Sequence, residues 1–177
     1  MVVEVRSFLT KKQFTNLLTF FTTHATPVQE DDQETFYFSG DADLRIQRNS
    51  FYSKVWLKKG KMHDAHREEI EIRFQREDFP LLEQLFLTLG FEVSIKWFRK
   101  RSTFKWKDMT VCLDFTKGYG YIIELEKMVS SDEKESTHQY LKEQLQSLEI
   151  SLTPREEFEQ RFQHYKDHWK TLIAAEN

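Results

Sequence analysis

Short runs in which charged and apolar residues alternate constrain the fold of this chain more than any other feature of its sequence. An alternation with a period of two is typical of a β-strand that has one apolar and one polar face. The clearest case is the run 67–75, where Glu69 and Glu71 alternate with Ile70 and Ile72. Similar runs occupy residues 2–9, 34–39, 43–48, 51–58, 91–104, 109–115 and 121–127. We therefore predict about eight strands, and the short connections between most of them favour antiparallel pairing.

Four segments carry apolar residues at helical spacing, and each has a start signal. Capping-box patterns mark three of the starts: Thr10 with Gln13, Ser130 with Glu133, and Thr153 with Glu156. In the fourth, Pro80 lies in the first turn and Gly90 ends the helix. Residues 25–33 are polar, and we predict that they form a loop.

Length and composition exclude several classes of protein. The 177 residues fit a single domain over 1–177, and the net charge of −3 gives no bulk electrostatic argument for binding nucleic acid. The single cysteine, Cys112, excludes an intramolecular disulfide framework and a Cys-rich zinc site. No apolar run approaches the ~20 residues of a membrane span, and no basic leader precedes the first apolar residues. We expect a cytoplasmic protein, monomeric or homodimeric, without a membrane or nucleic-acid partner.

The charged strand faces mix both signs, which has two interpretations. Each face could simply be solvated and carry cross-strand ion pairs. However, the helical segments need an apolar sheet face to cover, and a sheet of about eight strands tends to close. Helices on the outside would turn the charges inward, where they are costly without compensation. We therefore predict an α+β fold: an eight-stranded antiparallel β-barrel, or tunnel, with a charged interior and flanking helices.

A multiply charged anion with divalent cations would compensate such an interior. Arg and Lys bind phosphate oxygens, and Glu carboxylates bind Mg²⁺ or Mn²⁺. Glu124 and Glu126 lie two residues apart on one strand and therefore share a face, which Glu4 could join from the first strand. Neighbouring carboxylates raise each other's pKa unless a cation lies between them. An isolated E-x-E pattern is common in charged proteins, however, and does not by itself identify a metal site.

Several separated motifs resemble the CYTH superfamily, also called triphosphate tunnel metalloenzymes. The run Val2-Val3-Glu4-Val5-Arg6 resembles a degenerate form of its E-x-E-x-K signature, and residues 67–72 resemble its central acidic strand. Residues 98–104 resemble its K-x-R-x-x-Y strand, and residues 112–126 resemble its succession of Leu-Asp, G-x-G and E-x-E. The order and spacing agree along almost the whole chain. The family includes class IV adenylate cyclases, thiamine triphosphatases and inorganic triphosphatases.

The resemblance implies a small-molecule triphosphate bound by basic residues with Mg²⁺ or Mn²⁺. It implies metal ligands at Glu4, Glu124 and Glu126. It implies triphosphate-binding residues at Arg6, Arg45, Lys58, Arg99, Arg101 and Arg155. It implies catalytic residues that line the tunnel at Glu69, Glu71 and Asp114.

The chain departs from the family pattern at four positions. Val2 stands in the place of the first signature Glu and removes one expected metal ligand. Arg6 replaces the usual Lys, which keeps the charge and adds a fork of donors. Gln47 stands where the second Arg of an R-x-R pair is frequent, and Phe104 where Tyr is common.

The implied activity is metal-dependent cleavage of a phosphoanhydride bond in an inorganic, thiamine or nucleoside triphosphate. Hydrolysis is favoured because it demands less of the organic end of the substrate than cyclisation does. The first alternative is a class IV adenylate cyclase, which converts ATP to cyclic AMP and pyrophosphate. The second is a non-catalytic phosphate- or polyphosphate-binding module, which Val2 and Gln47 favour. A structural barrel held by internal salt bridges is a third.

Overall fold

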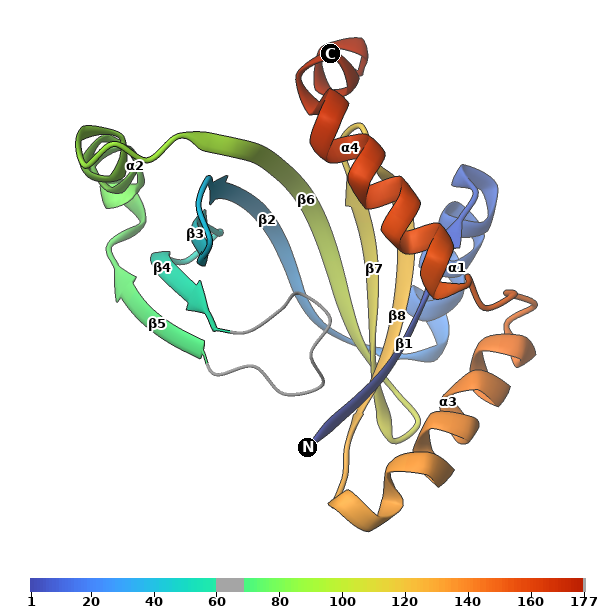
Figure 1. Cartoon of the computed structure of the whole chain (residues 1–177). Coiled ribbons are helices and arrows are strands. Elements are labelled where there is room, and N and C mark those ends of the chain that lie inside the picture. The colour runs from blue at the N-terminus through green and yellow to red at the C-terminus, as the bar shows by residue number, and fades with distance from the viewer. Residues whose placement is uncertain (60–68, 177) are drawn as a thin grey trace. The chain divides into compact units, whose positions relative to one another are not determined.

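A computed structural model describes residues 1–59 and 69–176 of the chain (Figure 1). The elements in chain order are β1 (Val2–Leu9), α1 (Lys11–His24), β2 (Thr26–Phe38), β3 (Asp43–Arg48), β4 (Ser53–Lys58), β5 (Glu69–Phe74), η1 (Arg76–Asp78), α2 (Phe79–Thr88), β6 (Val93–Trp106), β7 (Met109–Thr116), β8 (Gly120–Met128), η2 (Ser131–Glu133), α3 (Lys134–Ser147) and α4 (Arg155–Ala175). Residues 67 and 68, with which the predicted strand 67–75 and the acidic motif 67–72 begin, lie outside the described residues.

Eight antiparallel strands form one sheet with flanking helices, as predicted. The strand order is β1-β8-β7-β6-β2-β3-β4-β5. This order begins at β1 and ends at β5, and over residues 1–59 and 69–176 no ladder joins these two strands. The hydrogen-bonded sheet of the described residues is therefore open, whereas the prediction was a closed barrel. The chain divides into two compact units: unit 1 comprises Met1–Glu30 and Lys100–Asn177, and unit 2 comprises Asp31–Arg99.

Unit 1 has an apolar core between its strands and two helices. The buried residues of β1 and β8 include Val3, Val5 and Leu125, which alternate with the charged residues of the same strands. Helix α1 contributes Leu17 and Phe21 to this core, and α3 contributes residues such as Leu141 and Leu145. Figure 1 shows α1 and α3 beside β1 and β8. The capping boxes predicted at Thr10 and Ser130 are both formed. The helices of unit 1 thus cover the apolar strand faces, as the sequence pattern predicted.

Unit 2 has a smaller core in which α2 packs on β3 and β4. Phe79 and Leu82 of α2 are buried against Phe36 and Ile46. Charged side chains of β3 and β4, such as Arg45 and Lys54, lie on the opposite face, because residues at odd and even separations alternate across a strand. The predicted division into an apolar and a charged face therefore holds for these strands.

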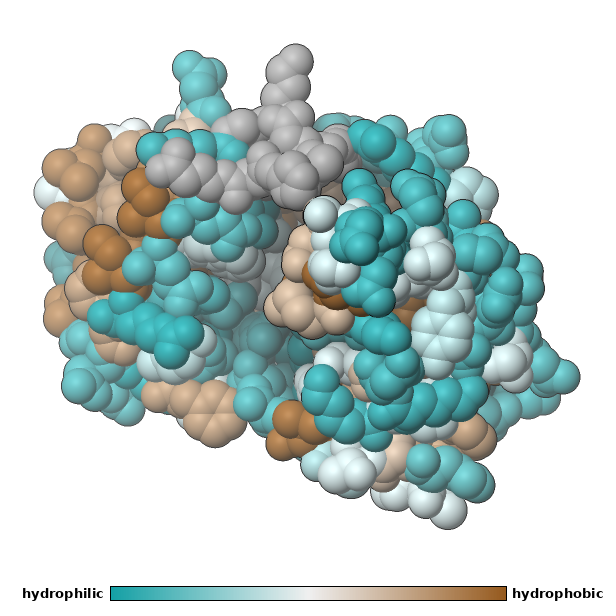
Figure 2. All heavy atoms as spheres, turned by 90° about the horizontal axis from the view of Figure 1, so that it is seen from below, coloured by the Kyte–Doolittle hydropathy of each residue, from teal (hydrophilic) through white to brown (hydrophobic). Residues whose placement is uncertain are grey.

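The apolar face of β5 differs from the prediction that helices cover the apolar strand faces. Ile70, Ile72 and Phe74 remain exposed, because α2 packs on β3 and β4. Leu81 and Leu85 of α2 are exposed as well. Figure 2 shows polar residues over most of the visible surface, with apolar residues gathered on the part that contains β5 and α2.

The prediction of a loop at residues 25–33 is wrong, because strand β2 already begins at Thr26. Residues 26–30 are exposed, so their side chains show no apolar alternation. Backbone pairing with the long neighbour β6 and polar side-chain contacts hold this part of the strand instead. Ser102 on β6 donates to the Glu30 carboxylate at 2.8 Å. A strand held mainly by backbone hydrogen bonds leaves no hydrophobic period in the sequence.

The start of α4 also differs from its prediction. Pro154 is the N-cap, and Thr153 does not cap the helix with its side chain. The Thr153 hydroxyl instead accepts from the backbone N–H of Phe8 at 2.9 Å and lies 2.9 Å from the hydroxyl of Ser7. Ser7, which is fully buried, also donates to the carbonyl of Ser151 at 2.5 Å. The segment before α4 is therefore tied to β1.

In the described parts of the chain, none of the helices combines the length and apolarity that crossing a bilayer requires.

The turn between β7 and β8 supports the far end of α4. Gly118 has a φ of 74°, and a Cβ atom at this position would lie 2.9 Å from the Cβ of Leu172. We expect Gly118→Ala to lower the free energy of unfolding by about 2–4 kcal/mol, because it combines left-handed strain with overpacking. Urea unfolding monitored by Trp fluorescence would measure the loss.

Gly90→Ala is the matched control for this substitution. Gly90 has a φ of 91°, but a Cβ there would meet nothing within 4 Å. Gly90→Ala should therefore lower the free energy of unfolding only by the cost of the left-handed backbone, about 1–2 kcal/mol. Equal losses for the two variants would contradict the proposed contact between the turn and α4.

Candidate functional site

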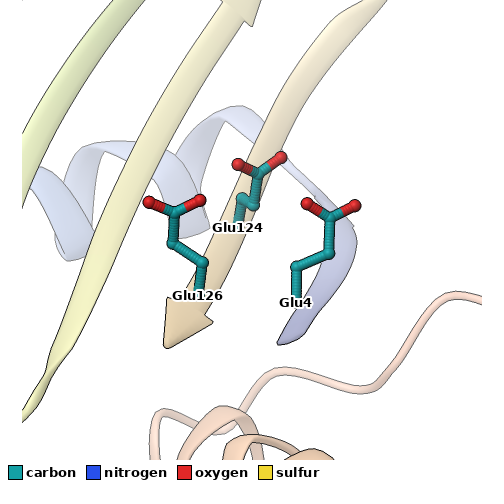
Figure 3. Close-up of side chains that lie close together, drawn as sticks. All are labelled: Glu4, Glu124 and Glu126. Atoms are coloured by element: carbon teal, nitrogen blue, oxygen red, sulfur yellow. The ribbon is translucent and has the colours of Figure 1, made fainter. Parts of the chain in front are cut away.

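Three carboxylates converge on the charged face of unit 1. Glu4 lies on β1, and Glu124 and Glu126 lie on β8. The antiparallel register places Glu4 opposite Glu126 and Arg6 opposite Glu124, so these side chains share one face. One carboxylate oxygen from each glutamate lies within 4.8 Å of the others (Figure 3). The ladder thus brings together residues that are about 120 positions apart in the sequence.

The donor set of these glutamates suits a hard divalent cation. Mg²⁺ binds oxygen ligands at about 2.1 Å, so oxygens on opposite sides of the ion are about 4.2 Å apart. The carboxylate oxygens of Glu4, Glu124 and Glu126 need only small side-chain movements to reach this spacing. Glu4, Glu124 and Glu126 therefore form a cluster of three possible ligands among the acidic, His and Cys side chains of residues 1–59 and 69–176.

Electrostatics makes the cluster unfavourable without a cation. Burial raises the pKa of Glu124; the charge of Arg101 opposes this rise, whereas the charges of Glu4 and Asp114 add to it. Burial also raises the pKa of Glu126, and the charge of Glu124 adds to that rise. A bound cation would relieve both the burial cost and the repulsion.

Arg101 and Asp114 form a fixed ion pair beside the three glutamates. The Nε and Nη2 atoms of Arg101 donate to the two Asp114 oxygens at 2.8 and 2.7 Å. Nη2 also lies 3.6 Å from Glu124. Although burial opposes it, the hydrogen bonds that Arg101 donates to Asp114 raise the pKa of Arg101, so the guanidinium stays charged. The structure therefore joins a predicted phosphate-binding residue and a predicted catalytic residue into one pair.

Arg6 and Cys112 complete the surroundings of the cluster. Arg6 lies 3.7 Å from Glu4, and both side chains are about half exposed. Cys112 is buried opposite Glu124 in the β7–β8 ladder, and burial raises its pKa to about 11. The sequence pattern had not led us to predict that Cys112 lies beside Glu124. Its spacing of two residues from Asp114 on one strand could have indicated it.

A second charged group lies within unit 2, around the ring of Trp56. Arg45 donates to both oxygens of Asp43, and its guanidinium lies 4.3 Å from the centroid of the Tyr37 ring. The predicted phosphate-binding residue Lys58 contacts Glu69 at 3.1 Å. Arg99, also predicted, donates to the side-chain oxygen of Gln33. Arg45, Lys58 and Arg99 are thus already engaged by polar partners.

Lys54 and Trp56 belong to this group although neither was among the predicted site residues. Lys54 is buried and contacts Glu71 at 2.9 Å. The Trp56 N–H donates to Glu69 at 3.0 Å. The alternation of Lys54, Trp56 and Lys58 on one face of β4 was the available signal.

Two further positions of the family pattern have local partners. Arg155 pairs with Glu159 on the exposed surface of α4 at 2.8 Å. Gln47 is buried, and its amide donates to the hydroxyl of Thr35 at 2.9 Å. The amide thus satisfies a buried position where a second arginine was expected.

The family model described as the CYTH domain matches residues 1–162. The chain belongs to the CYTH family. This confirms the resemblance inferred from the separated sequence motifs. CYTH proteins are in general metal-dependent, which agrees with the acidic cluster of β1 and β8.

The chain is also similar to a named relative and to solved structures. The protein from Methanocaldococcus jannaschii named "Putative adenylate cyclase MJ0240" is 29% identical over 133 residues, which cover 70% of this chain and 76% of that protein. The structure of PH1819 from Pyrococcus horikoshii has a TM-score of 0.69 at 24% identity and covers 88% of this chain and 94% of that one. HpAC1 from Hippeastrum has a TM-score of 0.63 at 16% identity and covers 88% and 93%. The two structural similarities show the fold.

The acidic cluster predicts how this CYTH protein binds metal. We expect Glu126→Gln to weaken Mn²⁺ binding by roughly ten- to a hundredfold, because ligand charge sets cation affinity. Isothermal titration calorimetry would measure the change. Glu143→Gln on α3 removes the same charge from an exposed position of unit 1 and should bind Mn²⁺ like the wild type. Equal affinities for all three proteins would contradict a metal site at Glu126.

The raised pKa values predict a pH dependence for the same binding. A cation binds the carboxylate form, so Mn²⁺ must displace protons that Glu124 and Glu126 retain at higher pH than ordinary glutamates. Affinity should therefore rise with pH through the raised pKa values. The metal-free fold should lose stability over the same range, because its native state binds more protons than the unfolded chain.

Calorimetry in two buffers of different ionisation enthalpy would detect the released protons. We expect proton release in the wild type and less release in Glu124→Gln. An affinity that is independent of pH between about 5 and 7, with no proton release, would show that these carboxyls are not the ligands.

Proposed function

We propose that this CYTH protein is a metal-dependent triphosphatase that cleaves a phosphoanhydride bond of an inorganic, thiamine or nucleoside triphosphate. The convergence of Glu4, Glu124 and Glu126 within 4.8 Å carries the proposal. Hard-oxygen donors next to a charged arginine suit a site in which a divalent cation and phosphate oxygens are held together.

In this proposal, Glu4, Glu124 and Glu126 hold Mg²⁺ or Mn²⁺. The ion, when bound, neutralises the charge that develops on the phosphate oxygens. Arg101 supplies a second positive charge from the protein itself. Its guanidinium has five N–H groups, and those not directed at Asp114 are assigned to a phosphate oxygen.

Asp114 then acts as a positioning residue. Both of its oxygens accept from Arg101, so the carboxylate holds the guanidinium at two points. Asp114 thus fixes the guanidinium before the substrate arrives. A charged donor that is already oriented needs no reorganisation when charge develops on the phosphate.

Adenylate cyclase activity is the second candidate, and the name of the M. jannaschii relative favours it. The Hippeastrum protein is described as a "putative adenylyl cyclase" with a dominant triphosphatase activity, but its 16% identity supports the fold alone. Cyclisation requires a ribose hydroxyl to be positioned against the α-phosphorus. Hydrolysis requires only that the phosphate chain be held, so we place it first.

A substrate panel tests the proposal. Tripolyphosphate, thiamine triphosphate and ATP are each incubated with the purified protein and Mg²⁺ or Mn²⁺, and phosphate, pyrophosphate and cyclic AMP are measured. We expect release of phosphate from at least one substrate. In Glu126→Gln the rate should fall by about a hundredfold or more, because the metal contributes several kcal/mol to the transition state.

Glu143→Gln should keep the wild-type rate, since its carboxylate lies on the exposed surface of α3. Pyrophosphate together with cyclic AMP would replace the triphosphatase with a cyclase. Binding of tripolyphosphate without turnover under either metal would replace it with a non-catalytic phosphate-binding module.

A further inference from the structure

Three cations of unit 2 are gathered around the ring of Trp56. The Nζ atoms of Lys54 and Lys58 lie 4.2 and 4.0 Å from the centroid of the Trp56 ring, and the guanidinium carbon of Arg45 lies 5.2 Å from it. Because the distances share one centroid, three positive charges occupy a small region. Cation–π attraction offsets part of their mutual repulsion.

Carboxylates of the neighbouring strand β5 form ion pairs with these lysines. Glu71 contacts Lys54 at 2.9 Å, and Glu69 contacts Lys58 at 3.1 Å. Trp56 donates its N–H to Glu69 as well. Although burial opposes it, these hydrogen bonds lower the pKa of both carboxyls, so both are charged at neutral pH.

The two sides of each ion pair differ in their access to solvent. The side chains of Glu69 and Glu71 are 43% and 30% exposed, whereas those of Lys58 and Lys54 are 18% and 11% exposed. Glu71 also accepts from Arg73 at 2.9 Å, so it can turn away from Lys54 toward the surface and keep a charged partner. Lys54 and Lys58, which lie over the Trp56 ring, would then become accessible to another anion.

We propose that Glu69 and Glu71 occupy the positions of anionic groups on Lys58 and Lys54, and that a linear polyphosphate binds unit 2 by displacing them. This proposal rests on the triphosphate-binding function stated above and adds a specificity-determining role for the two glutamates. They act as built-in competitors, so an anion that engages one lysine gains little. A chain that engages several cations at once gains from each further contact after the first.

The competitor role and the catalytic roles that the family resemblance implies for Glu69 and Glu71 predict opposite effects of removing these carboxylates. Removing a competitor strengthens the binding of the anion, whereas removing a group that assists binding or chemistry weakens binding or turnover. The isosteric change Glu71→Gln keeps the shape of the side chain and removes its charge. It separates the two roles in one measurement.

The experiment is calorimetric titration with sodium tripolyphosphate and with orthophosphate, in EDTA so that no divalent cation contributes. For the wild type we expect measurable binding of tripolyphosphate and no measurable binding of orthophosphate. For Glu71→Gln we expect about three- to tenfold tighter binding of tripolyphosphate, and orthophosphate binding should become detectable, since one competing ion pair of modest strength has been removed. Glu69→Gln should behave similarly.

Two controls exclude a general effect of net charge. Glu34→Gln makes the same charge change in unit 2, but its partner Arg48 lies 4.9 Å from the ring centroid of Phe79 on the α2 side of the sheet. It should leave tripolyphosphate affinity within about twofold of the wild type, because Glu34 and Arg48 lie on the face of the sheet opposite to Lys54. The double change Glu71→Gln with Lys54→Met should lose the gain. Circular dichroism and thermal unfolding confirm that each variant is folded.

The outcomes are distinguishable. Weaker tripolyphosphate binding in folded Glu71→Gln would overturn the competitor role and leave the triphosphatase proposal standing, provided that the wild type releases phosphate in the substrate panel. A gain of equal size in Glu34→Gln would also overturn it. Failure of the wild type and of both β5 variants to bind tripolyphosphate, together with no turnover, would overturn both proposals.

Discussion

The approach of three carboxylates across the β1–β8 ladder is the constraint on which the rest of unit 1 depends. Repulsion between Glu4, Glu124 and Glu126 opposes this register. The register is nevertheless fixed, because a shift by one residue would move Val5 and Leu125 out of the core that α1 and α3 cover. The hydrophobic face of the sheet thus holds together a charged cluster that would not form by itself. A divalent cation is the simplest group that turns this repulsion into binding.

Each unit of the protein compensates its charges in a different way. In unit 1, Arg101, which Asp114 holds in place, presents a positive charge to the carboxylate of Glu124. In unit 2, three cations gather around the Trp56 ring, and carboxylates of β5 pair with two of them. Both arrangements orient charged groups before any ligand binds. Such preorganisation is what electrostatic stabilisation of a phosphoryl group in transit requires.

The sequence predicted most of the fold and the acidic cluster, because both follow from local alternation. Glu124 and Glu126 had to share a face, and only the partner strand needed the structure. The strand at residues 26–33 could not be predicted, since backbone pairing with β6 supports it without an apolar period. The role of Thr153 was missed because its hydroxyl bonds to β1 rather than to its own helix. The partners of Lys54 depend on the pairing of β4 with β5, which sequence periodicity does not give.

The central claim is that the three glutamates of β1 and β8 hold a divalent cation that engages a phosphate chain. A crystal structure of the protein with Mn²⁺ and a non-hydrolysable tripolyphosphate analogue tests it most directly. The account predicts an anomalous difference peak about 2.0–2.3 Å from oxygens of Glu4, Glu124 and Glu126, with phosphate oxygens completing the coordination. Manganese bound elsewhere, or an analogue bound with no peak between these carboxylates, would contradict it.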